Sequence, residues 1–196
     1  MKKVSASFFV ISTNATFVGI GEEDTLMTTN RPASPLWATV NVTGVCNLQC
    51  EYCFFQPRKH EHMTIVDFIN VIAILKAQNA FFLTISGGEP FMHPRIIILM
   101  HAHDTFEHAT VLSNGTRIQK THVDCMRAII KRKGAFPLQI SRDAIDPDTN
   151  DKTRGMAFKV MKNLQVLRDA GITLTIAMVK TAMRTCRPCC PIWAAT

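Results

Sequence analysis

The sequence predicts an α/β fold made of parallel β/α units, and two observations carry this prediction. Five segments rich in β-branched and aromatic residues alternate with segments of helical periodicity across residues 37–179. In addition, every predicted strand except the last ends in a polar, cysteine-containing or glycine-rich cluster. In barrel-like α/β folds the carboxyl ends of the strands share the face that holds the active site. We therefore expect a barrel-like sheet with one functional rim.

The predicted strands cover residues 37–43, 81–86, 109–113, 137–141 and 172–179. Helices are expected at about 64–75, 96–101, 118–133 and 158–170, with a polar loop before the last of them. Thr64 and Asp67 form a capping-box pattern at the start of the first helix. Apolar residues at helical spacing predict the buried faces. These are Ile65, Phe68, Ile69, Ile72 and Leu75 in the first helix, Val123, Met126 and Ile130 in the third, and Val160, Met161, Leu164 and Leu167 in the fourth.

The 196 residues fit one domain with a sizeable core, and 47% hydrophobic with 19% charged residues is typical of a globular protein. Residues 1–35 are predicted to form a leader with two strand-like runs, 5–11 and 15–20, followed by a linker. Residues 36–180 form the predicted core domain. Residues 181–196 form an atypical tail rich in cysteine and proline, without helical periodicity.

The formal charge of +7 does not by itself indicate a nucleic-acid partner. The basic residues are scattered, and the longest run, 131–133, lies near a predicted helix end, where cations complement the helix dipole. No stretch has the length of a membrane span. The apolar run after Lys2 and Lys3 is interrupted at 12–16, so no secretory signal is expected. The seven cysteines are odd in number and clustered, which indicates a reducing compartment, and we predict a cytoplasmic protein.

Cys46, Cys50 and Cys53 follow the first predicted strand with C-x3-C-x2-C spacing. A four-iron cluster normally takes four thiolates, so three cysteines with no fourth nearby would leave one iron open to a substrate or cofactor. Two alternatives stay open. One is half of a zinc site, although the spacing lacks the paired pattern of zinc modules, and the other is three structural thiols. We expect an iron–sulfur cluster.

Further polar groups follow the later strands. Gly87 and Gly88 would let the backbone approach a ligand closely, and the Glu89 carboxylate could accept a hydrogen bond from an ammonium group. Ser141 could donate to a ribose hydroxyl, and Arg154 could bind a carboxylate. An ordinary tight turn would also explain the glycines.

Residues 46–53 (CNLQCEYC) together with 86–90 (SGGEP) resemble the radical S-adenosylmethionine (SAM) superfamily. Residues 113–115 (SNG) and 141–155 also resemble the branch of that superfamily that modifies peptides and proteins, which includes sulfatase-maturing and SPASM-type enzymes. The resemblance covers roughly residues 37–180. It implies a partial TIM-like barrel of the radical SAM type, with about five of six strands present in a C-terminally truncated chain.

The resemblance also implies the cofactors, a [4Fe–4S] cluster and SAM, and the residues that bind them. Cys46, Cys50 and Cys53 would hold the cluster, whose open iron would chelate the amino and carboxylate groups of SAM. The other cofactor-binding residues would be Tyr52 near adenine, Gly87, Gly88, Glu89 and Pro90 at the methionine amino group, Asn114 in the SNG motif, Ser141 by the ribose and Arg154 near the SAM carboxylate. No catalytic side chain can be named from the sequence.

By this resemblance the protein would be an enzyme that cleaves SAM reductively to methionine and a 5′-deoxyadenosyl radical, which abstracts a hydrogen atom, from a peptide or protein as the expected substrate. A reductant such as flavodoxin or ferredoxin would be its partner. The alternative is a fragment that binds a cluster or a partner without turnover. Cys186, Cys189 and Cys190 in the tail either ligate an auxiliary cluster or belong to a non-native end.

Overall fold

The computed structural model describes the backbone of residues 9–11 and 17–19, and residues 36–50, 52–53, 55 and 60–178 in full. The predictions made for the tail, including those for Cys186, Cys189 and Cys190, lie outside these residues.

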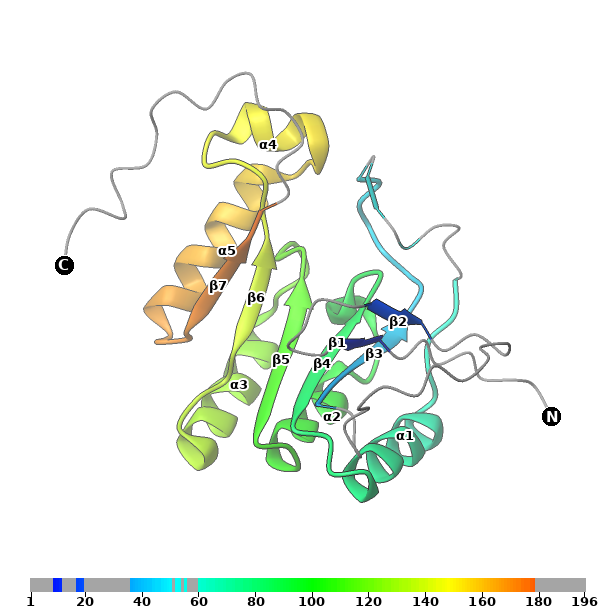
Figure 1. Cartoon of the computed structure of the whole chain (residues 1–196). Coiled ribbons are helices and arrows are strands. Elements are labelled where there is room, and N and C mark those ends of the chain that lie inside the picture. Colours follow the sequence, from blue (N-terminus) through cyan, green and yellow to red (C-terminus); the bar gives the residue numbers. More distant parts are fainter. Residues whose placement is uncertain are drawn as a thin grey trace.

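One parallel sheet of five strands, in the order β3-β4-β5-β6-β7, organises this part of the chain (Figure 1). The strands are β3 (Trp37–Thr43), β4 (Phe82–Gly87), β5 (His108–Ser113), β6 (Leu138–Ser141) and β7 (Leu174–Ala177). Each strand pairs with the next one in the chain, so every connection is a crossover that carries at least one helix. The predicted α/β fold is confirmed, and all five predicted strands are present.

Helices pack along the sheet. They are α1 (Ile65–Ala77), α2 (Ile96–Met100), α3 (Lys120–Lys133) and α5 (Ala157–Asp169), with the short 3-10 helices η1 (Pro90–Met92) and η2 (His101–Asp104). The remaining helix, α4 (Pro147–Thr153), lies at the end of the sheet to which the strand arrows point (Figure 1). Because all five strands run in the same direction, the cysteine loop after β3 and the turns after β4, β5 and β6 lie at this end too.

The presence of α4 corrects the prediction of a polar loop between β6 and α5. Asp146 caps this helix by accepting a hydrogen bond from the Thr149 backbone N–H at 2.8 Å, and Pro147 occupies its first turn. The helix is polar throughout, so it has no apolar periodicity from which it could be predicted. The capping residue and the proline are its only signals in the sequence.

Two short strands, β1 (Phe9–Ile11) and β2 (Phe17–Gly19), form an antiparallel pair, and β1 lies beside β3. They fall inside the predicted runs 5–11 and 15–20, so the prediction of strands is confirmed for residues 9–11 and 17–19. The division of the chain into leader, core and tail stays a prediction.

The hydrophobic core lies between the sheet and its helices, and the predicted helical faces are largely correct. Six of the predicted residues are buried: Phe68, Leu75, Val123, Met126, Val160 and Leu167. Two are wrong, because Ile69 is 57% exposed and Met161 is 43% exposed. In α1 the buried stripe runs through Val71 instead, since an almost wholly apolar helix gives no polar face from which its rotation can be read. Within the described residues, no helix combines the length and the apolar character needed to cross a membrane.

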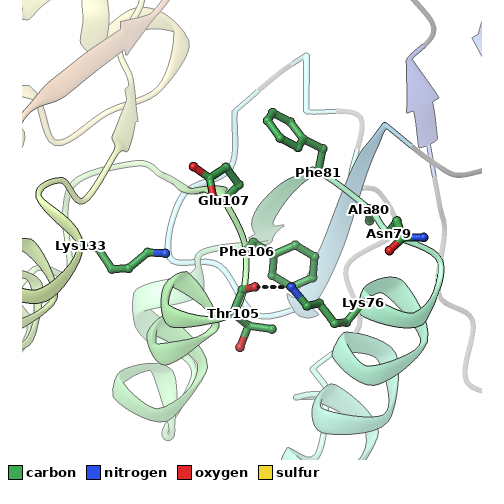
Figure 2. Close-up of a pocket in the computed structure, with 8 residues that line it drawn as sticks. All are labelled: Lys76, Asn79, Ala80, Phe81, Thr105, Phe106, Glu107 and Lys133. Carbon is green, nitrogen blue, oxygen red and sulfur yellow. Dashed lines mark hydrogen bonds between the residues drawn. The ribbon is translucent and has the colours of Figure 1, made fainter.

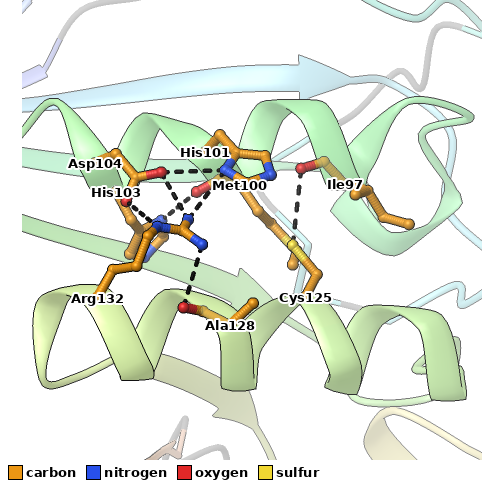
Figure 3. Close-up of polar contacts among 8 residues, drawn as sticks. All are labelled: Ile97, Met100, His101, His103, Asp104, Cys125, Ala128 and Arg132. Carbon is orange, nitrogen blue, oxygen red and sulfur yellow. Dashed lines mark hydrogen bonds and ion pairs between the residues drawn. The ribbon is translucent and has the colours of Figure 1, made fainter.

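A polar cluster joins α3 to η2 on the outside of the fold (Figure 3). Arg132 Nη2 lies 2.8 Å from Asp104 Oδ2, and His101 Nδ1 lies 3.1 Å from the same oxygen. Hydrogen bonding to Arg132 lowers the pKa of Asp104 below its ordinary value. Next to them, His103 is buried and stacks on Phe136 with ring centroids 4.2 Å apart. Because η2 directly precedes β5, this cluster lies at the end of the sheet where the strands begin.

A hollow of about 600 Å³ opens at the same end, where β4 and β5 begin (Figure 2). The ends of α1 and α3 and the segments just before these strands line it: Lys76, Asn79, Ala80, Phe81, Thr105, Phe106, Glu107 and Lys133. Lys76 Nζ donates to the Thr105 carbonyl across it at 3.2 Å. No predicted site residue lines this hollow. The predicted site residues lie at the opposite rim.

At that rim the turn after β4 packs against the end of β3 with almost no space between the two backbones. Gly88 N–H donates to the Thr43 carbonyl at 2.7 Å, and Glu89 N–H donates to the Val45 carbonyl at 2.8 Å. A Cβ on Gly87 would lie 2.3 Å from the Thr43 carbonyl oxygen, and one on Gly88 would lie 2.3 Å from that of Val45. Strand packing therefore explains both glycines, and it fixes where the cysteine loop leaves the sheet.

The side chain of Glu89 ties the same turn to the end of β5, and it is fully buried at 0% exposure. Its Oε1 accepts hydrogen bonds from the Phe91 N–H at 3.0 Å and the Ser113 hydroxyl at 2.9 Å, and Oε2 accepts from the Asn114 N–H at 2.7 Å. Burial raises the pKa of Glu89 to about 7, although these donors act in the opposite direction. One carboxylate thus joins the turns after two neighbouring strands.

Replacing Gly88 by alanine should lower the free energy of unfolding by about 2 kcal/mol or more, because the new Cβ would overlap the Val45 carbonyl and the backbone would have to move. Gly134→Ala is the matched control. Its Cβ would meet no atom within 4 Å, so only its left-handed backbone, with φ of +83°, opposes the change, at a cost of about 1 kcal/mol. Urea denaturation followed by circular dichroism measures both variants, and equal losses would contradict the close packing at Gly88.

The raised pKa of Glu89 gives a second prediction. A carboxyl group whose pKa is about 7 in the folded protein, against an ordinary 4.5, stabilises the fold most at low pH, and this contribution is lost as the pH rises through 7. The variant Glu89→Gln cannot ionise. Its free energy of unfolding should therefore gain up to about 3 kcal/mol relative to the wild type from pH 4.5 to about pH 8.

Denaturation curves across this pH range measure the difference. Glu107→Gln, which removes an exposed carboxylate, is the control and should track the wild type. A difference between Glu89→Gln and the wild type that runs in the opposite direction with pH would show that the three donors outweigh burial at this carboxylate.

Candidate functional site

The cysteine loop begins where β3 ends, and its base is held from two sides. The turn after β4 holds it through the Val45 carbonyl, and on the other side the Gly44 N–H donates to the Glu61 carbonyl at 2.9 Å. Further along, the Cys53 N–H donates to the Cys50 carbonyl at 3.2 Å, which makes a turn between these two cysteines. The loop is therefore anchored to the sheet where it starts, and its last two cysteines are close together.

N–H donors from three parts of the chain point at cysteine sulfurs. Cys46 Sγ accepts from the Leu48 N–H at 3.5 Å and from Asn114 Nδ2 at 3.8 Å. Cys50 Sγ accepts from Arg154 Nη1 at 3.9 Å. Such donors favour a thiolate over a thiol, because a charged acceptor makes the stronger hydrogen bond. The rim thus favours negative charge on sulfur.

Asn114, which follows β5, connects that strand to the cysteine loop. Its Nδ2 donates to Asn47 Oδ1 at 3.2 Å, and its Oδ1 accepts from the Thr116 hydroxyl at 2.6 Å. Asn47 Nδ2 donates back to the Thr116 hydroxyl oxygen at 2.9 Å. Since Glu89 binds the Asn114 backbone, the structure brings the predicted residues Cys46, Glu89 and Asn114 into one continuous set of contacts.

On the other side of the loop, Tyr52 and Arg154 meet at the carboxylate of Asp143. Arg154 Nε donates to Asp143 Oδ1 at 2.9 Å, and the hydroxyls of Tyr52 and Thr153 both donate to Oδ2. The Arg154 guanidinium lies over the Tyr52 ring, with Cζ 5.3 Å from the ring centroid. Burial, and next the hydrogen bond to Asp143, raises the pKa of Tyr52 above its ordinary value. The predicted residues Tyr52, Arg154 and Cys50 thus belong to a second set of contacts, with Asp143 at its centre.

The remaining predicted residues lie on the same rim. Gly87 and Gly88 are half-buried, and Pro90 is buried where it begins η1. Ser141 is half-buried at the end of β6, where it pairs in register with β7. Protein donors already occupy the carboxylate of Glu89, so the ammonium contact expected of this side chain stays a prediction.

The donor set fits an iron–sulfur cluster. Three thiols from one short loop, with N–H groups aimed at two of the sulfurs, supply the soft anionic ligands that iron–sulfur clusters take. Among the residues described, no three His, Cys, Asp or Glu side chains surround one point as the ligands of a single metal ion would. The fit to a cluster does not need such convergence, because each cysteine would bind a different iron of a four-iron cluster.

The polar residues of this rim that were not predicted include Asn47, Thr116 and Asp143. Asn47 lies between the first two cysteines, and Asp143 comes two positions after Ser141, so both fall inside motifs that the sequence does show. Their hydrogen bonds have no sequence signal. The partners Asn47 and Thr116 are 69 positions apart, and Tyr52 and Asp143 are 91 positions apart.

Comparison with known proteins gives a match to the family model of the radical SAM superfamily over residues 40–181. The chain is 29% identical over 150 residues to the antilisterial bacteriocin subtilosin biosynthesis protein AlbA of Bacillus subtilis (strain 168), covering 74% of this chain and 33% of AlbA. It is 25% identical over 157 residues to the mycofactocin maturase MftC of Mycobacterium tuberculosis (strain CDC 1551 / Oshkosh), covering 75% of this chain and 39% of MftC. The chain thus spans between 33% and 46% of the length of the curated relatives it matches.

Solved structures of SuiB from Streptococcus suis share the fold. SuiB bound to the precursor peptide SuiA gives a TM-score of 0.68 at 20% identity, covering 76% of this chain and 34% of SuiB. SuiB bound to S-adenosylmethionine gives a TM-score of 0.66 at 21% identity, covering 76% of this chain and 35% of SuiB. This likeness supports the partial barrel, and the family model covers more than half of the sequence. The chain therefore belongs to the radical SAM superfamily, whose cofactors are a [4Fe–4S] cluster and SAM.

Proposed function

We propose that this chain is the cluster- and SAM-binding core of a radical SAM enzyme that modifies a peptide or protein. The observation that carries the proposal is the meeting of the cysteine loop with two later segments. Asn114 and Arg154 point N–H groups at Cys46 Sγ and Cys50 Sγ, respectively. A site built in this way stabilises charge on sulfur. Family membership identifies the cluster as the group that such a site would hold.

In this proposal Cys46, Cys50 and Cys53 bind three irons of the [4Fe–4S] cluster. When bound, the cluster supplies the electron that cleaves SAM into methionine and a 5′-deoxyadenosyl radical. Arg154 would pair with the SAM carboxylate, because a guanidinium offers several N–H donors in one plane. Tyr52 carries the loop backbone that would lie near adenine, and its ring keeps water from one face of the guanidinium.

The neighbouring turns complete the proposed SAM site. The backbone of 87–90 would receive the methionine amino group, and Ser141 would lie by the ribose. Asn114 would hold the loop through Cys46 and Asn47 while SAM binds. The buried carboxylate of Glu89 would keep the turns after β4 and β5 at a fixed separation. We assign the abstraction of a hydrogen atom from the substrate to none of these side chains.

The proposed substrate class rests on the relatives. AlbA is named for bacteriocin biosynthesis, MftC is named a mycofactocin maturase, and SuiB has been solved with a precursor peptide. We infer a peptide or protein substrate for this chain as well. A reductant such as flavodoxin or ferredoxin would serve as partner, and the cytoplasm would keep the three thiols reduced.

A second candidate is a chain that binds the cluster or a partner without turnover. The observation that favours it is the outer edge of the described sheet. Within the residues described, β7 pairs with β6 alone, and Ile176 on this strand is 43% exposed. An exposed strand edge can pair with another chain. SAM cleavage therefore has to be measured separately from cluster binding.

Anaerobic reconstitution should give a brown protein with about four irons per chain. Each of the variants Cys46→Ala, Cys50→Ala and Cys53→Ala should lose most of this iron, because each removes one of three ligands. Cys125→Ala, which removes a half-buried cysteine of α3 that contacts the Ile97 carbonyl (Figure 3), is the matched control and should keep its iron. Iron and sulfide analysis measures the loading, and wild-type loading in the three loop variants would show that the cluster is bound elsewhere.

Under reduction with dithionite, the loaded protein should release 5′-deoxyadenosine from SAM. Arg154→Ala should slow this release by about ten-fold or more at limiting SAM, because a charge-assisted hydrogen bond to the carboxylate is lost. Chromatography of the quenched reaction measures the product. Full cluster loading without any SAM cleavage would favour the second candidate function.

A further inference from the structure

Asp143 lies at the centre of the contacts between the cysteine loop and α4. It belongs to the turn after β6, and its side chain is 4% exposed. Tyr52 reaches it from the cysteine loop, and Thr153 and Arg154 reach it from the end of α4. All three donate hydrogen bonds to one carboxylate. A single buried group therefore connects two segments that belong to different β/α units.

Asp143 is itself held in place through its backbone N–H. Its N–H donates to Asn150 Oδ1 at 3.1 Å, and Asn150 lies within α4 at 2% exposure. The Arg154 N–H donates to the Asn150 carbonyl at 2.9 Å. The turn after β6 and α4 thus form one unit, to which Tyr52 is attached from the cysteine loop.

The orientation of Arg154 depends on this carboxylate. Asp143 Oδ1 takes the Nε–H, which fixes the plane of the guanidinium and leaves Nη1 directed at Cys50 Sγ, 3.9 Å away. The Tyr52 ring covers one face of the guanidinium. Asp143 and the Tyr52 ring thus hold the guanidinium in one orientation. Its remaining N–H donors then point in fixed directions, as the binding of a carboxylate ligand requires.

We propose that Asp143 is a positioning residue that sets Arg154 and Tyr52 relative to each other, and so prepares this rim for the carboxylate of SAM. This inference rests on the proposed function, because it takes the cluster and SAM as the ligands of the rim. Asp143 does not touch the ligand in this proposal and acts through its two neighbours. Loss of its charge should therefore weaken SAM binding while the cluster remains fully loaded.

The variant Asp143→Asn separates charge from shape. Its amide still accepts a hydrogen bond on one side and can donate to the hydroxyls of Tyr52 and Thr153, so the turn keeps its contacts, but the ion pair with Arg154 is lost. We expect wild-type iron content. The Kd for SAM, measured anaerobically by equilibrium dialysis, should rise about ten-fold. The change that SAM causes in the electron paramagnetic resonance spectrum of the reduced protein should require correspondingly more SAM.

Asp146→Asn is the matched control. It removes the same charge from the same turn, but from an exposed residue that caps α4, and asparagine caps a helix as well as aspartate does. SAM binding by this variant should equal that of the wild type. The comparison removes any effect of net charge on the affinity for SAM.

Tyr52→Phe tests the link to the cysteine loop. Tyr52 is the one tyrosine in the sequence, so the tyrosine bands of the Raman spectrum report on its hydrogen bond alone. These bands should shift in Asp143→Asn and stay unchanged in Asp146→Asn. The double variant of Tyr52→Phe with Asp143→Asn should weaken SAM binding by less than the product of the two single effects, because both changes break one set of contacts.

The outcomes separate this inference from the proposed function. If the wild type binds neither the cluster nor SAM, the proposed function fails, and the positioning role fails with it. If the wild type binds both and Asp143→Asn binds SAM equally well, only the positioning role is overturned. Loss of iron in Asp143→Asn would make Asp143 a structural support of the cysteine loop, which overturns the positioning role as well.

Discussion

The close approach of the turn after β4 to the end of β3 is the contact on which the rest of the rim depends. Two backbone hydrogen bonds join these segments, and neither Gly87 nor Gly88 has room for a Cβ. The cysteine loop starts at this contact, so any separation of the two strands would move Cys46. The position of the cysteine loop therefore depends first on the distance between two backbone segments of the sheet.

Two buried carboxylates extend this contact across the rim, and they do so in different ways. Glu89 accepts hydrogen bonds from three uncharged donors and joins the turns after β4 and β5, and its complete burial raises its pKa. Asp143 takes Arg154 and two hydroxyls, and it joins the turn after β6 to the cysteine loop. Burying a carboxylate without hydrogen-bond donors costs roughly several kcal/mol of folding free energy. Each of the two carboxylates therefore keeps its donors in one arrangement. Polar contacts within the protein itself thus hold the rim together.

The sequence predicted the order and type of most elements because they follow local rules. Apolar β-branched runs marked every strand of the sheet, and Gly134 ended α3 in the left-handed conformation that favours glycine. The misses also have local causes. The helix α4 is polar on all sides, and α1 is apolar on nearly all sides, so neither shows which face packs. Of the site residues, sequence motifs predicted the three cysteines and Arg154. Asp143 lies in one of these motifs but was not predicted.

The sequence by itself determined the parallel α/β fold, the rim where function would lie and the set of thiols, because spacing along the chain carries this information. Only the tertiary structure decided that the glycines serve strand packing, that Glu89 is enclosed, and that Tyr52 meets Arg154 at Asp143. The physical reason is that these contacts join residues far apart in the chain, whose distance is set by the crossover connections of the sheet. A motif can name such residues, and only the fold can bring them within a hydrogen bond of each other.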